Sequence, residues 1–121
     1  MKKRLLVAED DQQLNALYKQ KLGSAGFDVK TVTDGAMVFS AIRDWTPDLI
    51  LLDLLMPKKD GYEVLKELKK NHATKHIPVV IASNLGEMDN RQMCLQMGAV
   101  DYFVKTEITL SGLADKLKKF L

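Results

Sequence analysis

The chain has 121 residues, 46% of them hydrophobic, which is enough for one compact domain with its own core and too little for two. Its net charge of +2 at pH 7 comes from basic and acidic residues interleaved along the chain, so direct nucleic-acid binding is not indicated. No apolar run approaches the roughly 20 residues that cross a bilayer, and residues 1–4 do not lead into a secretory signal. We therefore expect a cytoplasmic protein with no membrane partner, formed by a single domain over residues 1–121.

The first 45 residues alternate between short apolar strands and amphipathic helices. A strand is predicted at residues 3–8, and three acids, Glu9, Asp10 and Asp11, follow it directly. Asp11 is expected to cap a helix at residues 12–23. The sequence next predicts a strand at 29–32 and a helix at 35–45, and the buried stripe of the first helix is predicted to consist of Leu14, Leu17, Tyr18 and Leu22.

The run at residues 49–52 is apolar throughout and ends on a carboxylate, Asp53. It is too short for a helix, follows Pro47 and lacks the alternation of a half-exposed strand, so it predicts a strand buried on both faces in a parallel sheet. In open α/β sheets, ligands bind beyond the carboxyl ends of the strands, near the point where the strand order reverses. Asp53 is therefore the leading candidate for chemistry, and a loop or helix-capping aspartate is the alternative interpretation.

The second half of the chain continues the alternation. Lysines on the predicted helix at 61–71 are interpreted as a solvated face, and Cys94, the one cysteine, as a small core residue in a reducing compartment. Ser83 and Lys105 each follow a predicted strand. The elements of this half are the helix at 61–71, the strand at 77–82, a helix at about 86–97, the strand at 100–104, and a last helix capped by Thr109 with Leu110, Leu113 and Leu117 inward.

Five βα units with right-handed crossovers predict a doubly wound α/β sheet with the first and third strands in the centre. The two histidines, His72 and His76, are expected at the end of the sheet away from the strand-end acids. Polar side chains are expected to converge on the carboxyl edge of the sheet, namely Glu9, Asp10, Asp53, Ser83 and Lys105.

Clustered carboxylates repel one another unless a cation lies among them. Oxygen ligands without His or Cys indicate a hard ion, and Mg²⁺ favours one or two carboxylates, here Asp10 and Asp53, with waters and a phosphate oxygen. A metal beside a free carboxylate, with the Lys105 ammonium and the Ser83 hydroxyl opposite, suits phosphoryl transfer by in-line attack of the carboxylate on phosphorus. The product would be an aspartyl phosphate.

Four stretches of the sequence carry a resemblance to a known family, namely the pair Glu9-Asp10, Asp53 in Asp-Leu-Leu-Met-Pro-Lys-Lys-Asp-Gly, Ser83, and Gly-Ala-Val-Asp-Tyr-Phe-Val-Lys at 98–105. With these motifs the sequence resembles, over its whole length, the receiver domain of two-component response regulators, of the chemotaxis-regulator-like kind. The resemblance implies a flavodoxin-like fold, with a five-stranded parallel sheet in the order 2-1-3-4-5 and helices on both faces. It also implies a signalling switch that catalyses its own phosphorylation and dephosphorylation, and not an enzyme that turns over a substrate.

By that resemblance, Asp53 accepts a phosphoryl group from the phosphohistidine of a sensor histidine kinase or from a phosphotransfer protein. Mg²⁺ is the implied cofactor, bound by Asp10, Asp53 and the Leu55 carbonyl, with Glu9 acting through a water. Three departures from the family pattern are Ser83, where Thr is commoner, Asn84, where a small residue is usual, and Thr106, which replaces a proline.

The family resemblance also implies which residues bind the phosphoryl group and respond to it. Ser83 and Lys105 are expected to bind its oxygens, and Tyr102 matches an aromatic switch residue that swings inward when Ser83 is drawn to the phosphate. We expect residues 88–97, Tyr102 and the last helix to carry the contact that depends on phosphorylation. The partner in this contact is an unidentified target or a second copy of the chain. The alternative is that Met93 and Met97 are core filler. Because Thr106 replaces proline, the Lys105–Thr106 bond is predicted to be trans.

Three other functions are alternatives for a chain of this pattern. A pseudo-receiver would keep the fold as an interaction module without phosphorylation, but all five site residues are present. An aspartyl-nucleophile phosphatase of the haloacid dehalogenase type needs a second acid two residues after the nucleophile, where Leu55 stands, and an FMN carrier needs a Gly- and hydroxyl-rich loop where residues 9–11 are acidic. The sequence leaves the output open, between a stand-alone regulator, a phosphorelay shuttle and a domain of a longer protein.

Overall fold

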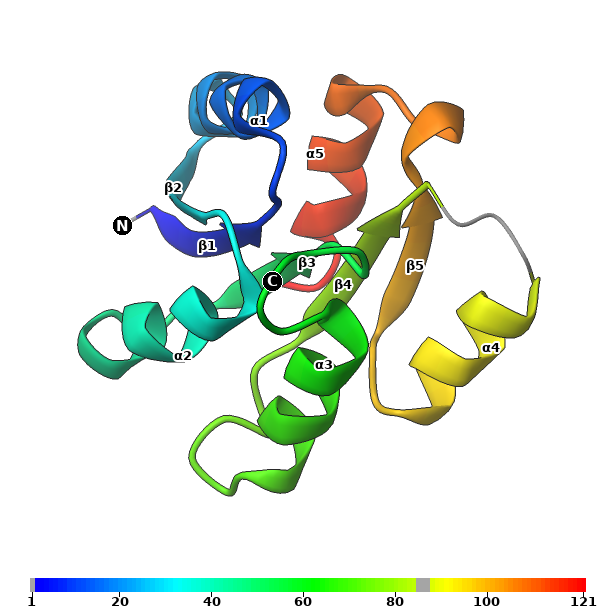
Figure 1. Ribbon diagram of the computed structural model, residues 1–121. Coiled ribbons are helices and arrows are strands. Elements are labelled where there is room, and N and C mark those ends of the chain that lie inside the picture. The colour runs from blue at the N-terminus through cyan, green and yellow to red at the C-terminus, as the bar shows by residue number, and fades with distance from the viewer. Residues whose placement is uncertain (1, 85–87) are drawn as a thin grey trace.

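Five parallel strands form one sheet in the order β2-β1-β3-β4-β5, which confirms the predicted strand order. The computed structural model describes residues 2–84 and 88–121. The strand order reverses between β1 and β3, so these two strands lie side by side inside the sheet (Figure 1). The strands are β1 (Lys3–Ala8), β2 (Phe27–Val32), β3 (Leu49–Leu52), β4 (Val79–Ser83) and β5 (Asp101–Val104).

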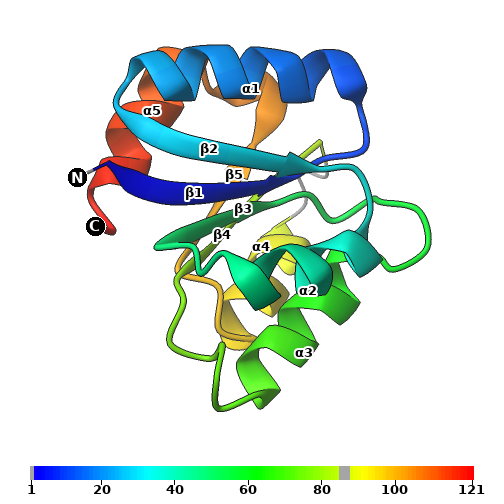
Figure 2. The same cartoon turned by 90° about the vertical axis from the view of Figure 1, so that its left-hand side faces the viewer.

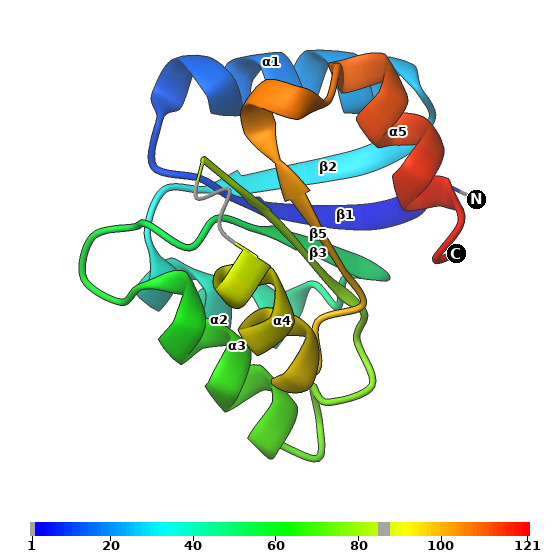
Figure 3. The same cartoon turned by 90° about the vertical axis from the view of Figure 1, so that its right-hand side faces the viewer.

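Helices cover both faces of the sheet, with α1 and α5 on one face and α2, α3 and α4 on the other (Figure 2, Figure 3). None of the helices in the described part of the chain has the length and apolar character that a membrane span requires. The helices are α1 (Gln12–Ser24), α2 (Gly35–Asp44), α3 (Gly61–Lys70), α4 (Met88–Gln96) and α5 (Leu110–Lys118), and a short 3₁₀ turn, η1 (Lys105–Glu107), follows β5.

The continuous apolar run of β3 is explained by burial on both faces. Leu49 and Leu51 pack in the cluster that includes α1 and α5, whereas Ile50 and Leu52 pack in the cluster under α2, α3 and α4. None of the four is more than 2% exposed. Cys94 is fully buried in the second of these clusters, as predicted.

β2 and β4 each begin two residues away from their predicted starts. β4 begins at Val79, two residues late, because Pro78 has no N–H to donate, although its carbonyl still accepts a hydrogen bond from the Ile50 N–H at 3.0 Å. β2 begins earlier than predicted, because Phe27 pairs in register with Lys3 of β1. The predicted start of the fourth helix at Gly86 lies outside the described residues.

The predicted buried stripe of α1 is wrong at Leu17, which is 45% exposed. The buried residues of α1 are Asn15, Tyr18 and Leu22, spaced by three and four. Leu17 lies about 100° around the helix from Tyr18 and so points away from the sheet. The prediction failed because it counted apolar residues only and left Asn15 out of the buried face.

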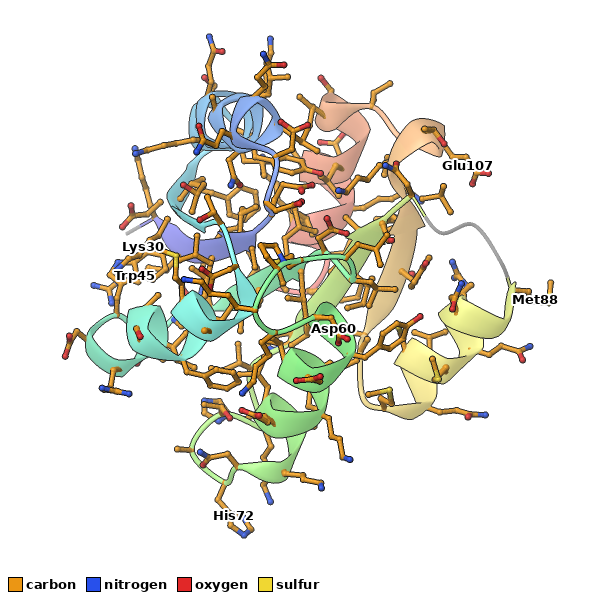
Figure 4. All side chains as sticks on the ribbon, in the orientation of Figure 1. Lys30, Trp45, Asp60, His72, Met88 and Glu107 are labelled. Atoms are coloured by element: carbon orange, nitrogen blue, oxygen red, sulfur yellow. The ribbon has the colours of Figure 1, made fainter. Side chains whose placement is uncertain are left out.

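Trp45, predicted as the end of a helix, follows α2 in an extended conformation. Two cations lie over its ring, with the Arg4 guanidinium 5.4 Å and the Lys30 ammonium 5.6 Å from the ring centroid. Figure 4 shows Lys30 and Trp45 close together beside α2. These cation–π contacts favour the extended conformation over another helical residue.

Gly61 allows α3 to begin directly above the end of β3. A Cβ at this position would lie 2.2 Å from the Asp53 carbonyl oxygen and 2.6 Å from the Leu54 Cα. The Gly61 N–H donates to the Leu54 carbonyl at 2.8 Å, and Asp60 caps the helix through the Glu63 N–H. Because the atoms that a side chain would meet belong to the backbone, they cannot move aside.

Gly61→Ala should therefore destabilise the fold by about 2 kcal/mol or more. Gly23→Ala is the matched control, since Gly23 lies in α1 and an added Cβ would meet nothing within 4 Å. That variant should stabilise the fold by about 0.5–1 kcal/mol. Urea unfolding measures both changes, and an unchanged midpoint for Gly61→Ala would contradict the close approach.

Candidate functional site

The carboxyl ends of the strands bring the predicted site residues to one edge of the sheet. Glu9 and Asp10 come directly after β1, and Asp53 comes directly after the neighbouring strand β3. Ser83 is the last residue of β4, and Lys105 begins the turn after β5. The chain therefore places three acids, a hydroxyl and an ammonium along four adjacent strands.

Lys105 joins two of the acids. Its ammonium forms an ion pair with the Glu9 carboxylate and lies 3.0 Å from Asp53 Oδ2. Glu9, Asp10 and Asp53 each offer a carboxylate oxygen, and these oxygens lie within 4.8 Å of one another. Glu9 and Asp53 are 2% and 6% exposed, whereas Asp10 is exposed, so solvent reaches the cluster from the side of Asp10.

The charges in this cluster do not balance, because three carboxylates share one ammonium. Burial raises the pKa of Glu9 to about 7, the contact with Lys105 opposes this shift, and Asp10 and Asp53 add to it. Burial lowers the pKa of Lys105, but its contacts with Glu9 and Asp53 outweigh burial and raise it overall. Glu9 is therefore the acid of the cluster that keeps a proton up to about neutral pH. A divalent cation held by oxygen ligands would offset the negative charge of the cluster in place of that proton.

Backbone hydrogen bonds hold the acids in place. The Asp53 N–H donates to the Ala8 carbonyl at 3.0 Å, which ties the end of β3 to the end of β1. The Asp11 N–H donates to Glu9 Oε2 at 3.2 Å while the Asp11 side chain caps α1, as predicted. The Leu55 N–H lies 3.4 Å from Asp53 Oδ1, so Leu55 lies beside the cluster.

Asn15 and Tyr18 lie near the site, a placement that was not predicted from the sequence. Asn15 donates from Nδ2 to the Glu9 carbonyl at 2.5 Å. Tyr18 is buried, which raises the pKa of its hydroxyl to about 12, and Lys105, Glu9 and Asp53 all influence that pKa. The available signal was a polar residue, Asn15, at helical spacing from buried Tyr18 and Leu22, on a face otherwise expected to be apolar.

The residues matched to the family switch lie inside the fold. Ser83 is fully buried and Tyr102 is 2% exposed. Burial raises the pKa of the Tyr102 hydroxyl, and its hydrogen bond with Ser83 acts in the opposite direction. Arg91 of α4 donates to the Tyr102 carbonyl at 2.9 Å, and this hydrogen bond links β5 to α4.

Two departures from the family pattern can be placed. Asn84 is exposed just beyond β4. The Lys105–Thr106 peptide bond is trans, which confirms the prediction made from the missing proline.

The histidines lie far from the acids, as predicted. His72 and His76 belong to the connection between α3 and β4, which leads into the amino end of β4. Figure 4 shows His72 at the end of α3 opposite to Asp60, the residue that caps the start of this helix near the site. A cavity of about 480 Å³ between α2 and this connection lies at the same remote end, whereas the acids lie on an open edge.

The sequence matches the family described as the response regulator receiver domain over residues 5–118. The chain belongs to this family. It is 38% identical over 102 residues to the transcriptional regulatory protein CpxR of Klebsiella pneumoniae, a match that covers 84% of this chain and 42% of the relative. It is 35% identical over 102 residues to the DNA-binding dual master transcriptional regulator RpaA of Synechocystis, with the same two coverages.

Solved receiver domains agree. The Francisella response regulator 1452 receiver domain matches with a TM-score of 0.89 and 30% identity, covering 98% of this chain and 95% of that one. The BeF₃-activated receiver domain of Klebsiella pneumoniae RstA matches with a TM-score of 0.89 and 30% identity, covering 97% of both chains. The chain spans less than half the length of the curated relatives that it matches.

The pKa of Glu9 predicts a pH dependence of this receiver in metal-free buffer. A pKa of about 7, raised from its ordinary 4.5, means that the folded state binds this proton more tightly than the unfolded state. The stability that Glu9 contributes is then fully present below pH 4.5 and is lost as the pH rises through 7.

Glu9→Gln should remove this loss, so between pH 5 and pH 8 the parent should lose on the order of 2 kcal/mol relative to the variant. Glu63→Gln, on the exposed surface of α3, is the control. Urea unfolding in EDTA at both pH values measures the difference. Parallel pH profiles for the parent and Glu9→Gln would show that the folded state does not raise the pKa of Glu9.

Proposed function

We propose that residues 1–121 form one phosphorylatable receiver domain, which accepts a phosphoryl group on Asp53 from the phosphohistidine of a sensor histidine kinase or a phosphotransfer protein. The observation that carries the proposal is the contact of a buried carboxylate, Asp53, with an ammonium at 3.0 Å beside two further acids at the carboxyl edge of the sheet. Family membership supports it. The working compartment would be the cytoplasm.

The donor set fits Mg²⁺, because all the candidate ligands are oxygens and the cluster has excess negative charge. Asp10, Asp53 and the Leu55 carbonyl would hold the ion, with Glu9 acting through a water. When bound, Mg²⁺ supplies positive charge to the phosphoryl oxygens. This role accounts for three acids at one edge better than helix capping does, since Asp11 already caps α1.

The chain's own groups then have separate roles. A carboxylate oxygen of Asp53 forms a bond to phosphorus as the bond from phosphorus to the imidazole nitrogen breaks, and the electron pair of that bond leaves with the imidazole. Lys105, held beside Asp53, stabilises charge on a phosphoryl oxygen, and the Ser83 hydroxyl binds another. The domain acts as a switch with an autocatalysed phosphorylation step, and not as an enzyme with a separate product.

Signal output would run through Tyr102. Ser83 is hydrogen-bonded to Tyr102, so a phosphoryl group that draws Ser83 toward itself changes the partner of the buried phenol. Arg91 carries any movement of this strand to α4. Met88 and Met93 are 70% and 43% exposed on α4, available to a partner or a second copy, whereas Met97 packs against the core.

Asp53→Asn should abolish labelling by acetyl phosphate in Mg²⁺, because an amide is a poor nucleophile. Asp115→Asn, on the exposed surface of α5, should label like the parent, and EDTA should abolish labelling of both the parent and this control. Intact-mass spectrometry measures the added phosphoryl group. Persistent labelling of Asp53→Asn would assign the acceptor to another acid and end this proposal.

Beryllofluoride, a phosphoryl mimic, should change amide hydrogen exchange in α4, β5 and α5, because Tyr102 lies in β5, the exposed methionines lie in α4, and α5 follows β5 along the chain. The comparison uses the same protein with Mg²⁺ and with or without the mimic. Exchange changes confined to α2, which lies away from β5 (Figure 1), would contradict an output through Tyr102.

A further inference from the structure

Asn15 is a buried amide in the first turns of α1, where an apolar residue would be expected. It is 6% exposed and shares the buried face of α1 with Tyr18 and Leu22. Asparagine is a weaker helix former than leucine, and a buried amide is unfavourable unless it is hydrogen-bonded. Its presence at this position therefore needs a reason beyond packing.

The contacts of Asn15 provide that reason. Its Nδ2 donates to the Glu9 carbonyl at 2.5 Å and lies 3.4 Å from the Val32 carbonyl. The Glu9 N–H also donates to the Val32 carbonyl at 3.0 Å. The Asn15 amide therefore links the start of α1 to the chain just after β1 and to the last residue of β2.

The Glu9 carbonyl belongs to the peptide bond that joins Glu9 to Asp10. Because this unit is planar, fixing its oxygen fixes the direction in which the chain enters Asp10. These two residues supply two of the three carboxylates of the cluster. Asn15 thus acts on the relative placement of the acids without contacting either carboxylate.

The acceptor end of the same side chain points to the same role. Asn15 Oδ1 is buried and has no hydrogen-bond partner within the described residues. Turning the amide over would place this oxygen against the Glu9 and Val32 carbonyl oxygens, so the observed orientation is the favourable one. A residue present only for packing would not leave a polar atom unpaired, whereas one selected for its donor would.

We propose that Asn15 is a positioning residue for the Mg²⁺ site, which holds the Glu9–Asp10 peptide in the orientation that lets both acids face Asp53. This inference rests on the proposed function for the identity of the ion, but not on phosphoryl transfer. Losing a residue that orients metal ligands typically weakens metal binding by 10- to 100-fold.

Asn15→Leu keeps the size of the side chain and removes both donors. It should weaken Mg²⁺ binding by about tenfold, measured by isothermal titration calorimetry. The rate of labelling by acetyl phosphate should fall in proportion at low Mg²⁺ and return to within about twofold of the parent at saturating Mg²⁺, because Asp53 and Lys105 themselves are unchanged. A merely structural role would not separate the two conditions.

Thr74→Val is the matched control, since the Thr74 hydroxyl donates to the Leu68 carbonyl at 2.7 Å at the opposite end of the sheet. It should lower the melting temperature and leave Mg²⁺ affinity unchanged. Asn15→Ala, which introduces the best helix former, replaces Asn15→Leu if the latter does not fold. Parental Mg²⁺ affinity in the folded variant would overturn the inference.

The same measurements separate this inference from the proposed function. A parent that binds Mg²⁺ but is not labelled on Asp53 would refute phosphoryl transfer and leave the comparison of affinities intact. A parent that is labelled, with Asn15→Leu equal to it in Mg²⁺ affinity, would refute only the role of Asn15. A parent that binds no Mg²⁺ would overturn both.

Discussion

Three carboxylates with one ammonium are the constraint on which the rest of this site depends. Glu9 and Asp53 are almost fully buried, and burial disfavours the charged form of an acid. Lys105 offsets part of the charge, and the exposed position of Asp10 leaves the cluster open to solvent. An arrangement that is unfavourable alone becomes favourable when positive charge arrives, so the site is suited to binding a cation and a group that the cation accompanies.

The elements around this cluster differ in how much of their surface is buried: β1, β3 and the start of α3 are closely packed, whereas α4 is not. β1 and β3 are buried on both faces, and Gly61 allows α3 to start in contact with the Asp53 backbone. In α4, by contrast, Cys94 is the one fully buried residue among the described side chains. Polar links hold this helix, from Tyr62 to Asn90 and from Arg91 to the Tyr102 carbonyl. A helix with little buried apolar surface can shift at low cost, which suits the output side of a switch.

The fold and the acids could be predicted because local patterns specify them. A four-residue apolar run after proline that ends on Asp53 predicts a central strand and places its acid at the ligand-binding edge. The role of Asn15 could not be predicted, because its amide contacts one carbonyl six residues away in sequence and another seventeen residues away. Leu17 was misplaced for the same reason, since only the three-dimensional contacts show that a polar residue belongs to the buried face of α1.

Buried polar side chains gather at one edge of the sheet. Among the described residues, all five of them lie at or beside the carboxyl ends of strands, and they are Glu9, Asn15, Asp34, Asp53 and Ser83. Asp34 caps α2 through the Met37 N–H, and Asn15 holds the acidic loop, so these two orient backbone. Glu9 and Asp53 belong to the acidic cluster, and Ser83 is hydrogen-bonded to Tyr102. At the opposite edge none of the described polar side chains is buried, and the charged residues at the strand starts, Lys3, Arg4 and Asp101, are exposed or half-buried. Since burying polar atoms is unfavourable unless they are paired, their concentration at one edge supports the proposal that the chemistry takes place there.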